Sequence, residues 1–167
     1  MINKKICELI NEQINKELES AYLYLGFANY FTEKNLDGFA HWYQVQANEE
    51  IEHAKKFIDY LHVNGYIVKL EKIDVVDDDF DDDVEVLSKG LQHEKFITAT
   101  IENIYKEAIS LNDLRTQVFL NWFIDEQSEE EENAQYLLDS YSRFVCDCEC
   151  GCTCGLYELD KELGERK

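Results

Sequence analysis

Four glutamates occupy positions where hydrophobic core residues would be expected, each well inside a stretch with helical periodicity. They are Glu17, Glu50, Glu94 and Glu130, and Gln127 interrupts the last apolar stripe one turn before Glu130. An unpartnered buried carboxylate is strongly unfavourable, and four together repel one another. Because no Lys or Arg occupies these stripes, a polyvalent cation is the most direct way to neutralise them.

A histidine strengthens the metal interpretation. His53 follows Glu50 by three residues, so on a helix both side chains lean to one face and can bind one ion. Carboxylates with one imidazole suit iron or manganese better than copper, with zinc as a competitor. Glu17 precedes Glu50 by 33 residues and Glu94 precedes Gln127 by 33. This repeated spacing predicts two similar helical hairpins that together could hold two metal ions bridged by a carboxylate.

The alternative is that these are ordinary glutamates whose carboxylates reach solvent along the edge of each helix. Any one of them could be explained in that way. Four at matched positions, with a histidine one turn beyond the second, favour a metal site.

The elements that would position these residues are long helices. Alternating steps of three and four between apolar residues predict helices over 3–33, 38–64, 84–110 and 113–145, and a short one over 156–163. The chain has no proline, and proline disrupts helix interiors. Asn112 or Asp113 is expected to cap the fourth helix. Two short links around one long link predict an all-α four-helix bundle with a single long crossover, formed by residues 1–167 as one domain.

Composition excludes several classes of function. The 167 residues include 36 acidic and 16 basic ones, for a formal charge of −20. This charge argues against binding to nucleic acid or to an anionic membrane surface. The N-terminal residues do not resemble a signal peptide, and the sequence has no apolar stretch of about 20 residues. We therefore expect a cytoplasmic protein whose six cysteines are thiols.

Four strings of the sequence resemble the non-haem bacterial ferritins. They are NEEIEHAKK (48–56), QHEKFIT (92–98), WFIDEQSEEEE (122–132) and GLYELDKEL (155–163). The resemblance extends over nearly the whole chain. It implies a four-helix subunit with a short fifth helix, assembled as a hollow 24-mer. Such a shell oxidises Fe(II) with O₂ or H₂O₂ at a ferroxidase centre in each subunit and stores the Fe(III) mineral inside.

The resemblance also implies particular iron ligands. The first iron site would use Glu17, Glu50 and His53. The second would use Glu50 as a bridge with Glu94 and Glu130, and Gln127 would lie beside it. A third site would use Glu49, Glu126 and Glu129 together with Glu130. Tyr24 matches the family's tyrosine beside the two irons, a candidate electron donor, and Trp122 falls where the family also has tryptophan.

Related classes differ at identifiable residues. Haem-binding bacterioferritins use methionine as the axial ligand, and Met1 is the only methionine of this chain, so no haem is expected. A diiron oxygenase or peroxidase is the main alternative, but such enzymes usually carry a second Glu-x-x-His, and here Ile97 follows Glu94 by three residues. Rubrerythrin-like peroxidases carry Cys-x-x-Cys, which the sequence lacks. DNA-protecting mini-ferritins lack a fifth helix and bind iron between subunits.

Two segments depart from the resemblance. Alternating cysteines lie in the link 146–154 before the fifth helix: Cys146, Cys148, Cys150, Cys152 and Cys154. Thiolates so spaced could bind a soft metal such as Zn, Cu(I) or Cd, form disulfides across a symmetry axis, or be free thiols of a flexible or engineered loop. An acidic run before the third helix (residues 77–83) lacks the glycine and spaced glutamate of a calcium loop, so we expect it to be solvated, with its last members near that helix's N-terminus. Cys7 is expected in the core.

Overall fold

The computed structural model describes residues 2–74, 79–145 and 154–167. Within these ranges the chain forms five helices: α1 (Lys4–Glu33), α2 (Asp37–Val63), α3 (Asp83–Ser110), α4 (Leu114–Phe144) and α5 (Cys154–Leu163). Each helix begins and ends within two residues of the position that the sequence predicted. The predicted all-α architecture is therefore confirmed.

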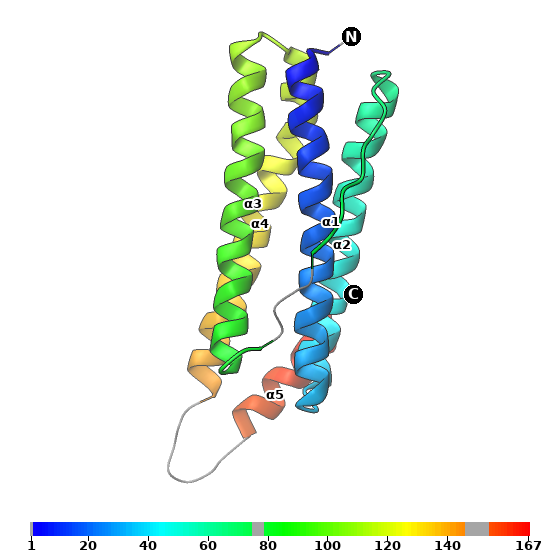
Figure 1. Ribbon diagram of the computed structural model, residues 1–167. Coiled ribbons are helices and arrows are strands. Elements are labelled where there is room, and N and C mark those ends of the chain that lie inside the picture. Colours follow the sequence, from blue (N-terminus) through cyan, green and yellow to red (C-terminus); the bar gives the residue numbers. More distant parts are fainter. Residues whose placement is uncertain (1, 75–78, 146–153) are drawn as a thin grey trace.

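The long helices form two hairpins that pack side by side (Figure 1). α1 pairs with α2 and α3 pairs with α4, while residues 64–74, the described first part of the crossover, run down along the α1–α2 hairpin. Asn35 and Asn112, in the two tight links, have φ angles of 57° and 52°, a region that asparagine tolerates better than most residues. Asp113 caps α4 as predicted, accepting a hydrogen bond from the Thr116 backbone at 3.1 Å.

Two side-chain amides fix the crossover to α1. Asn11 accepts a hydrogen bond from the Lys69 backbone N–H at 2.7 Å and donates to the Lys69 carbonyl at 3.0 Å. Asn15 accepts from the Glu71 backbone N–H at 2.7 Å. These bonds satisfy backbone groups of an extended segment that lacks a neighbouring strand. Nothing in the periodicity of α1 indicated this role.

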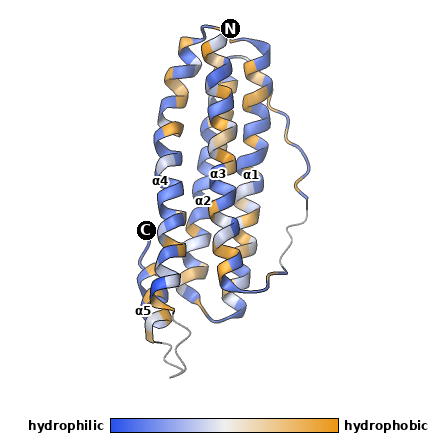
Figure 2. Ribbon diagram, turned by 90° about the vertical axis from the view of Figure 1, so that its left-hand side faces the viewer, coloured by the Kyte–Doolittle hydropathy of each residue, from blue (hydrophilic) through white to orange (hydrophobic). Residues whose placement is uncertain are grey.

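Hydrophobic residues form two separate clusters along the bundle. One cluster lies toward the α5 end and contains Tyr24, Phe31 and Tyr43. The other lies toward the N-terminal end and contains Ile10 and Phe57, together with Cys7, as predicted. Figure 2 shows the hydrophobic residues distributed along every long helix. Between the clusters, each long helix contributes buried polar residues, so a polar layer crosses the middle of the bundle.

α5 packs across the end of the bundle against the start of α2. The Asp160 carboxylate accepts hydrogen bonds from the backbone N–H groups of Gly38 and Phe39, at 2.9 and 3.0 Å. It thereby satisfies free donors at the N-terminus of α2. A Cβ at Gly38 would lie 1.6 Å from the Asp160 carbonyl oxygen, so the close approach of the two helices requires glycine.

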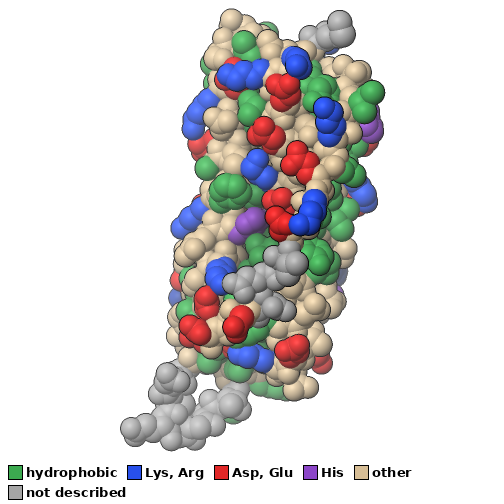
Figure 3. Space-filling model, viewed as in Figure 1, with side chains coloured by type: hydrophobic (Ala, Val, Ile, Leu, Met, Phe, Trp, Pro, Cys, Tyr) green, Lys and Arg blue, Asp and Glu red, His purple; other side chains and the backbone are tan. Residues whose placement is uncertain are grey.

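The surface carries mixed charges on the face shown in Figure 3, where Lys and Arg side chains are scattered among Asp and Glu. In the described part of the chain, no helix combines the length and the apolar character needed to cross a membrane.

Candidate metal centre

The polar layer contains the four glutamates that interrupt the apolar stripes. Glu17, Glu50, Glu94 and Glu130 are 0, 2, 3 and 5% exposed, as deeply buried as the hydrophobic residues around them. They come from α1, α2, α3 and α4 respectively. The interpretation that their carboxylates reach solvent is therefore wrong, because the side chains point into the bundle.

Glu17, Glu50 and His53 form one group that could hold a metal ion, with one donor atom of each within 4.8 Å of the others. His53 Nδ1 lies 3.4 Å from a Glu50 carboxylate oxygen. Glu17 accepts a hydrogen bond from Gln13 on one oxygen, while its other oxygen, Oε2, has no hydrogen-bond partner among the described residues. A buried, unpartnered carboxylate oxygen on a member of this group fits a cation at this position.

His53, Glu126 and Glu130 form a second group of the same kind. Here the other ring nitrogen, His53 Nε2, lies 3.6 Å from a Glu126 oxygen. The imidazole packs edge-on against Trp122 and Phe123, with ring centroids 5.5 and 6.2 Å away. The two carboxylates and the two aromatic rings together fix the orientation of the imidazole between the candidate groups.

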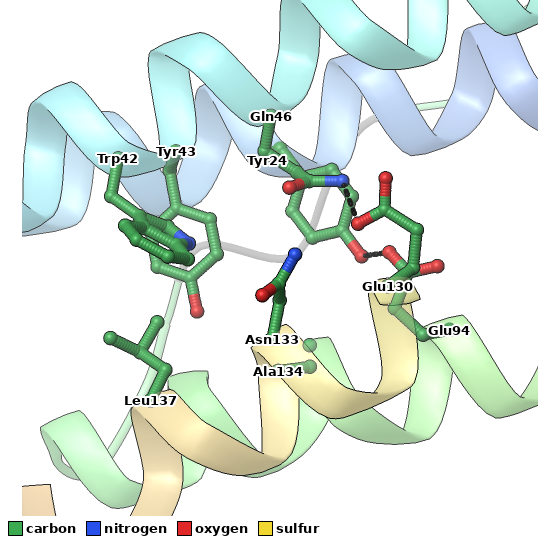
Figure 4. A pocket seen from close by; sticks show the side chains of 10 residues that line it. Tyr24, Trp42, Tyr43, Gln46, Glu94, Glu130, Asn133, Ala134 and Leu137 are labelled. Carbon is green, nitrogen blue, oxygen red and sulfur yellow. Dashed lines mark hydrogen bonds between the residues drawn. The ribbon is translucent and has the colours of Figure 1, made fainter. Parts of the chain in front are cut away.

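Glu94 lies in the same layer but is engaged by neighbouring side chains. It accepts a hydrogen bond from the Tyr24 hydroxyl and one from the Gln127 amide at 3.3 Å. Figure 4 shows Tyr24 and Glu94 at one side of a small cavity of about 20 Å³, which Gln46 and Glu130 also line. A cavity of this size has room for about one water molecule.

The electrostatics of the layer show the cost of burying these acids. Burial, reinforced by the charge of Glu50, raises the pKa of Glu94 to about 8. Burial and the charges of Glu94 and Glu50 likewise raise the pKa of Glu130 to about 8. Burial and Glu50 raise the pKa of Glu17 well above its usual value. A divalent cation would favour the ionised form of all these carboxyls.

Glu50 is the exception. Burial opposes its ionisation, but the hydrogen bond and charge of His53 outweigh that effect and lower its pKa. The pKa of His53 is raised because Glu50, Glu130 and Glu126 outweigh the opposing effect of burial. Within the described ranges, no Lys or Arg forms an ion pair with Glu17, Glu94 or Glu130. His53 alone provides too little positive charge for the whole layer.

Two glutamines that the sequence interpretation missed support the layer. Gln13 donates to Glu17 at 2.9 Å, and Gln46 donates to Glu50 at 3.0 Å and to Glu130 at 2.8 Å. Each glutamine lies four residues before a glutamate of the layer, one helical turn away. That shared spacing was the signal in the sequence that could have identified them.

Comparison with known proteins agrees with this geometry. A family described as "Ferritin-like domain" matches residues 7–144. The chain belongs to the ferritin family. A "Bacterial non-heme ferritin" of Bacteroides fragilis (strain 638R) is 36% identical over 166 residues, covering 99% of this chain and 100% of that protein. A protein of the same name from Staphylococcus epidermidis is 35% identical over 166 residues, and the match covers 99% of this chain and 97% of that protein.

A solved ferritin structure is also similar over the whole length. The crystal structure described as a novel open pore ferritin from the hyperthermophilic archaeon Archaeoglobus fulgidus superimposes with a TM-score of 0.94. Sequence identity is 35%, and the alignment covers 100% of both chains. The fold of this ferritin therefore agrees with that of a solved relative from end to end.

The remaining predicted ligands of this ferritin lie in different surroundings. Glu49 is half-buried and forms an ion pair with Arg166 at 2.5 Å. Glu129 is exposed to solvent on α4. Cys154 is exposed at the start of α5, whereas the other cysteines of the link, Cys146, Cys148, Cys150 and Cys152, lie outside the described residues. A third iron site and a soft-metal site stay predictions.

Proposed function

We propose that this ferritin stores iron and oxidises Fe(II) to Fe(III) at a pair of sites in the polar layer. The observation that carries the proposal is the burial of four carboxylates from four helices around one histidine, with an unpartnered oxygen on Glu17. Two Fe(II) ions carry four positive charges, which balance four ionised carboxylates. Iron here is the substrate, and the layer is the place where it is bound and oxidised.

The first candidate group, with Glu94 and Glu130 beside it in the layer, suggests how the pair would be held. Glu17 and His53 would bind the first Fe(II), Glu94 and Glu130 would bind the second, and Glu50 would bridge the two. Glu126 would hold the distal nitrogen of His53 and so fix the ring orientation, as carboxylates commonly do for metal-bound histidines. Tyr24 would orient Glu94 through its hydroxyl, with Gln127 on the other side of that carboxylate.

The chemistry follows from the charge of the site. Carboxylate oxygens stabilise Fe(III) more than Fe(II), because the harder and more highly charged ion gains more from anionic ligands. This difference favours electron loss from each of the two Fe(II) ions. The two electrons pass to O₂, which gains two protons and leaves as H₂O₂, or to H₂O₂, which gains two protons and leaves as two water molecules. The protein contributes position and charge.

The small cavity supports a ferroxidase over an oxygenase with an organic substrate. Its volume of about 20 Å³ accommodates a molecule the size of water beside Glu94 and Glu130. A carbon substrate would need a much larger space, since pockets for such ligands usually enclose some 300 Å³ or more. The cavity therefore favours oxidation of the metal itself by a small oxidant.

Storage requires a container, and we propose that the chain assembles into a shell of 24 copies. The similarity over full length to proteins named bacterial non-heme ferritin supports this assembly. Twenty-four chains of charge −20 carry a formal charge of −480, a field that concentrates cations at the shell. Size-exclusion chromatography with light scattering would give about 24 times the 19.7 kDa of one chain. A dimer or a 12-mer under all conditions would contradict the proposed shell.

The oxidation step can be tested by one substitution and a matched control. Glu50→Ala removes the proposed bridge, so rapid Fe(II) oxidation in a stopped-flow experiment should be lost. Glu52→Ala removes an acidic residue from the same helix, but Glu52 is exposed and pairs with Lys55, so its trace should match the unsubstituted protein. An unchanged rate in Glu50→Ala, with assembly intact, would contradict the proposed centre.

A further inference from the structure

The C-terminal tail turns back from α5 and lies along α2. Figures 1 and 2 both place the C-terminus above α5, part-way up the bundle. Arg166 makes most of the contacts. Its backbone carbonyl lies 2.8 Å from the His41 ring nitrogen, and its guanidinium lies over the Trp42 ring at 4.2 Å and donates to the Trp42 carbonyl at 3.2 Å.

The same guanidinium extends to the edge of the polar layer. Its Nη2 donates to a Glu49 oxygen at 2.5 Å and to the Gln46 side-chain oxygen at 2.9 Å. The Arg166 side chain is only 13% exposed, whereas that of Glu49 is 40% exposed. The positive charge is therefore largely enclosed at the boundary between the layer and the solvent.

Arg166 and the Glu50 carboxylate together fix which way the Gln46 amide faces. A guanidinium is only a donor, so the amide must present its oxygen to Arg166. The NH₂ group then points to Glu50 at 3.0 Å and to Glu130 at 2.8 Å. If the amide were reversed, its NH₂ group would face the Arg166 guanidinium, which is also a donor. Its oxygen would then face the carboxylates of Glu50 and Glu130, which are also acceptors. Arg166 thus acts through Gln46 on two proposed ligands of the iron pair.

Arg166 also occupies the side of Glu49 that a cation would need. Glu49 adjoins Glu50 in the sequence, and its pKa is raised by burial although Arg166 opposes that shift. Ion pairing directs its carboxylate toward the tail, and the metal-binding groups within the described ranges contain Glu126 and Glu130 without Glu49. A further metal ion at Glu49 must displace the guanidinium or bind beside a like charge.

We propose that Arg166 is a positioning residue and a built-in competitor for metal at the edge of the centre. It keeps Glu49 from binding a third metal ion and holds the Gln46 amide toward Glu50 and Glu130, so that two ions bind in preference to three. The proposal rests on the iron pair proposed above. The C-terminal tail then controls how many ions the centre holds, in addition to anchoring α5.

Metal binding without turnover tests this role. The assembled protein, stripped of metal, is titrated with Zn²⁺ in a calorimeter, and the number of ions and the dissociation constants are compared among variants. Arg166→Met keeps the apolar stem on Trp42 but removes the charge. Lys167→Met removes an equal charge from the exposed neighbouring residue. Arg166→Lys keeps the charge without the planar fork, whose Nη2 contacts Glu49 and Gln46 while Nη1 contacts the Trp42 carbonyl.

Arg166→Met should bind a third ion about tenfold more tightly than Lys167→Met, because a nearby like charge no longer opposes the divalent cation. The third-ion affinity of Arg166→Lys should lie between those of these two variants. Adding Glu49→Gln to Arg166→Met should return the third-ion affinity to that of Lys167→Met. An equal third-ion affinity in the Arg166→Met and Lys167→Met variants would overturn the proposal. So would a gain that persists after Glu49→Gln.

Failure of the underlying iron pair would look different. In that case the unsubstituted protein would not bind two Zn²⁺ ions per chain, and Glu17→Ala would not change its titration. If Arg166→Met failed to assemble, a chain shortened by residues 166 and 167 provides the same comparison against one lacking residue 167 alone. Equal third-ion affinity in those two chains would also overturn the proposal.

Discussion

Gln46 lies one helical turn before Glu50, and its amide nitrogen donates a hydrogen bond to the Glu50 carboxylate at 3.0 Å. Gln13 has the same relation to Glu17 on the neighbouring helix, at 2.9 Å. In both cases a neutral donor supports a buried acid without adding charge. This arrangement leaves the negative charge of the layer for metal to neutralise while limiting the cost of burying the carboxylates.

Gln46→Ala should therefore weaken both the fold and the centre. The substitution removes hydrogen bonds to Glu50 and Glu130, which should cost roughly 1–3 kcal/mol in the free energy of unfolding of the metal-free protein. Fe(II) oxidation should slow because two ligands lose their orientation. Gln92→Ala, at an exposed position of α3, is the control for both denaturation and stopped-flow measurements. Equal stability of the two variants would contradict the structural role of Gln46.

Metal binding should release protons near neutral pH. The pKa values of Glu94 and Glu130 are raised to about 8 by burial and neighbouring negative charge, so both are mainly protonated at pH 7 before metal arrives. Filling the pair with Zn²⁺ should release about two to three protons per chain at pH 7, because the pKa of Glu17 is raised as well, and fewer at pH 9. Calorimetry in buffers of different ionisation enthalpy measures that number. Release independent of pH between 7 and 9 would contradict the prediction.

The same shifts predict how the stability of the metal-free protein depends on pH. Raised pKa values mean that the folded state binds more protons than the unfolded state between the ordinary glutamate pKa of 4.5 and about 8. The contribution of Glu94 and Glu130 is thus fully present below pH 4.5 and is lost as the pH rises through about 8. Replacing either acid with Gln should flatten the fall in unfolding free energy across this range, measured by denaturant titration at one protein concentration. A slope unchanged in both variants would show that these acids do not titrate in this way.

Tyr24→Phe removes the hydroxyl that orients Glu94 but keeps the packing of the aromatic ring. The Tyr24 ring packs against Phe27 and Tyr43 with centroids 5.7 Å away in each case, and phenylalanine keeps those contacts. Loss of the hydroxyl leaves Glu94 with the weaker Gln127 bond at 3.3 Å, so Fe(II) oxidation should slow severalfold with little change in assembly. Tyr43→Phe is the matched control in the same aromatic cluster. Equal rates in the two variants would contradict a role for the hydroxyl.

The helices and the four central acids were predictable because both follow from local periodicity. Apolar residues at every third or fourth position define one face of a helix. Glu17 and Glu94 can be recognised because each is a charged residue at a position of that apolar face. The burial of these residues then follows from the packing of the four faces together. The hydrogen-bond partners of these acids could not be predicted in this way, because they depend on which helices are neighbours in the bundle.

Contacts made by the tail and the crossover were not predictable for the same reason. Arg166 and Glu49 are 117 positions apart, and they meet only after α5 has docked. Asp83 was expected in a solvated acidic loop, but the structure buries it between Lys34 at 2.5 Å and Tyr141 at 2.8 Å. Asp82 does cap α3, accepting from the Glu85 backbone at 2.8 Å, as the position of the run near that helix suggested.

Asp160 anchors α5 to the start of α2. Asp160 accepts hydrogen bonds from Gly38 and Phe39 at the start of α2, so Asp160→Ala should leave two backbone donors unsatisfied, at a cost of about 1 kcal/mol. Because the tail reaches Glu49 only through α5, the substitution should also speed proteolysis after residue 160 and tighten binding of a third Zn²⁺ ion. Glu158→Ala, at an exposed position of the same helix, should change neither property. If Asp160→Ala loosened the tail without altering the third ion, Arg166 would anchor the C-terminus and have no influence on metal binding.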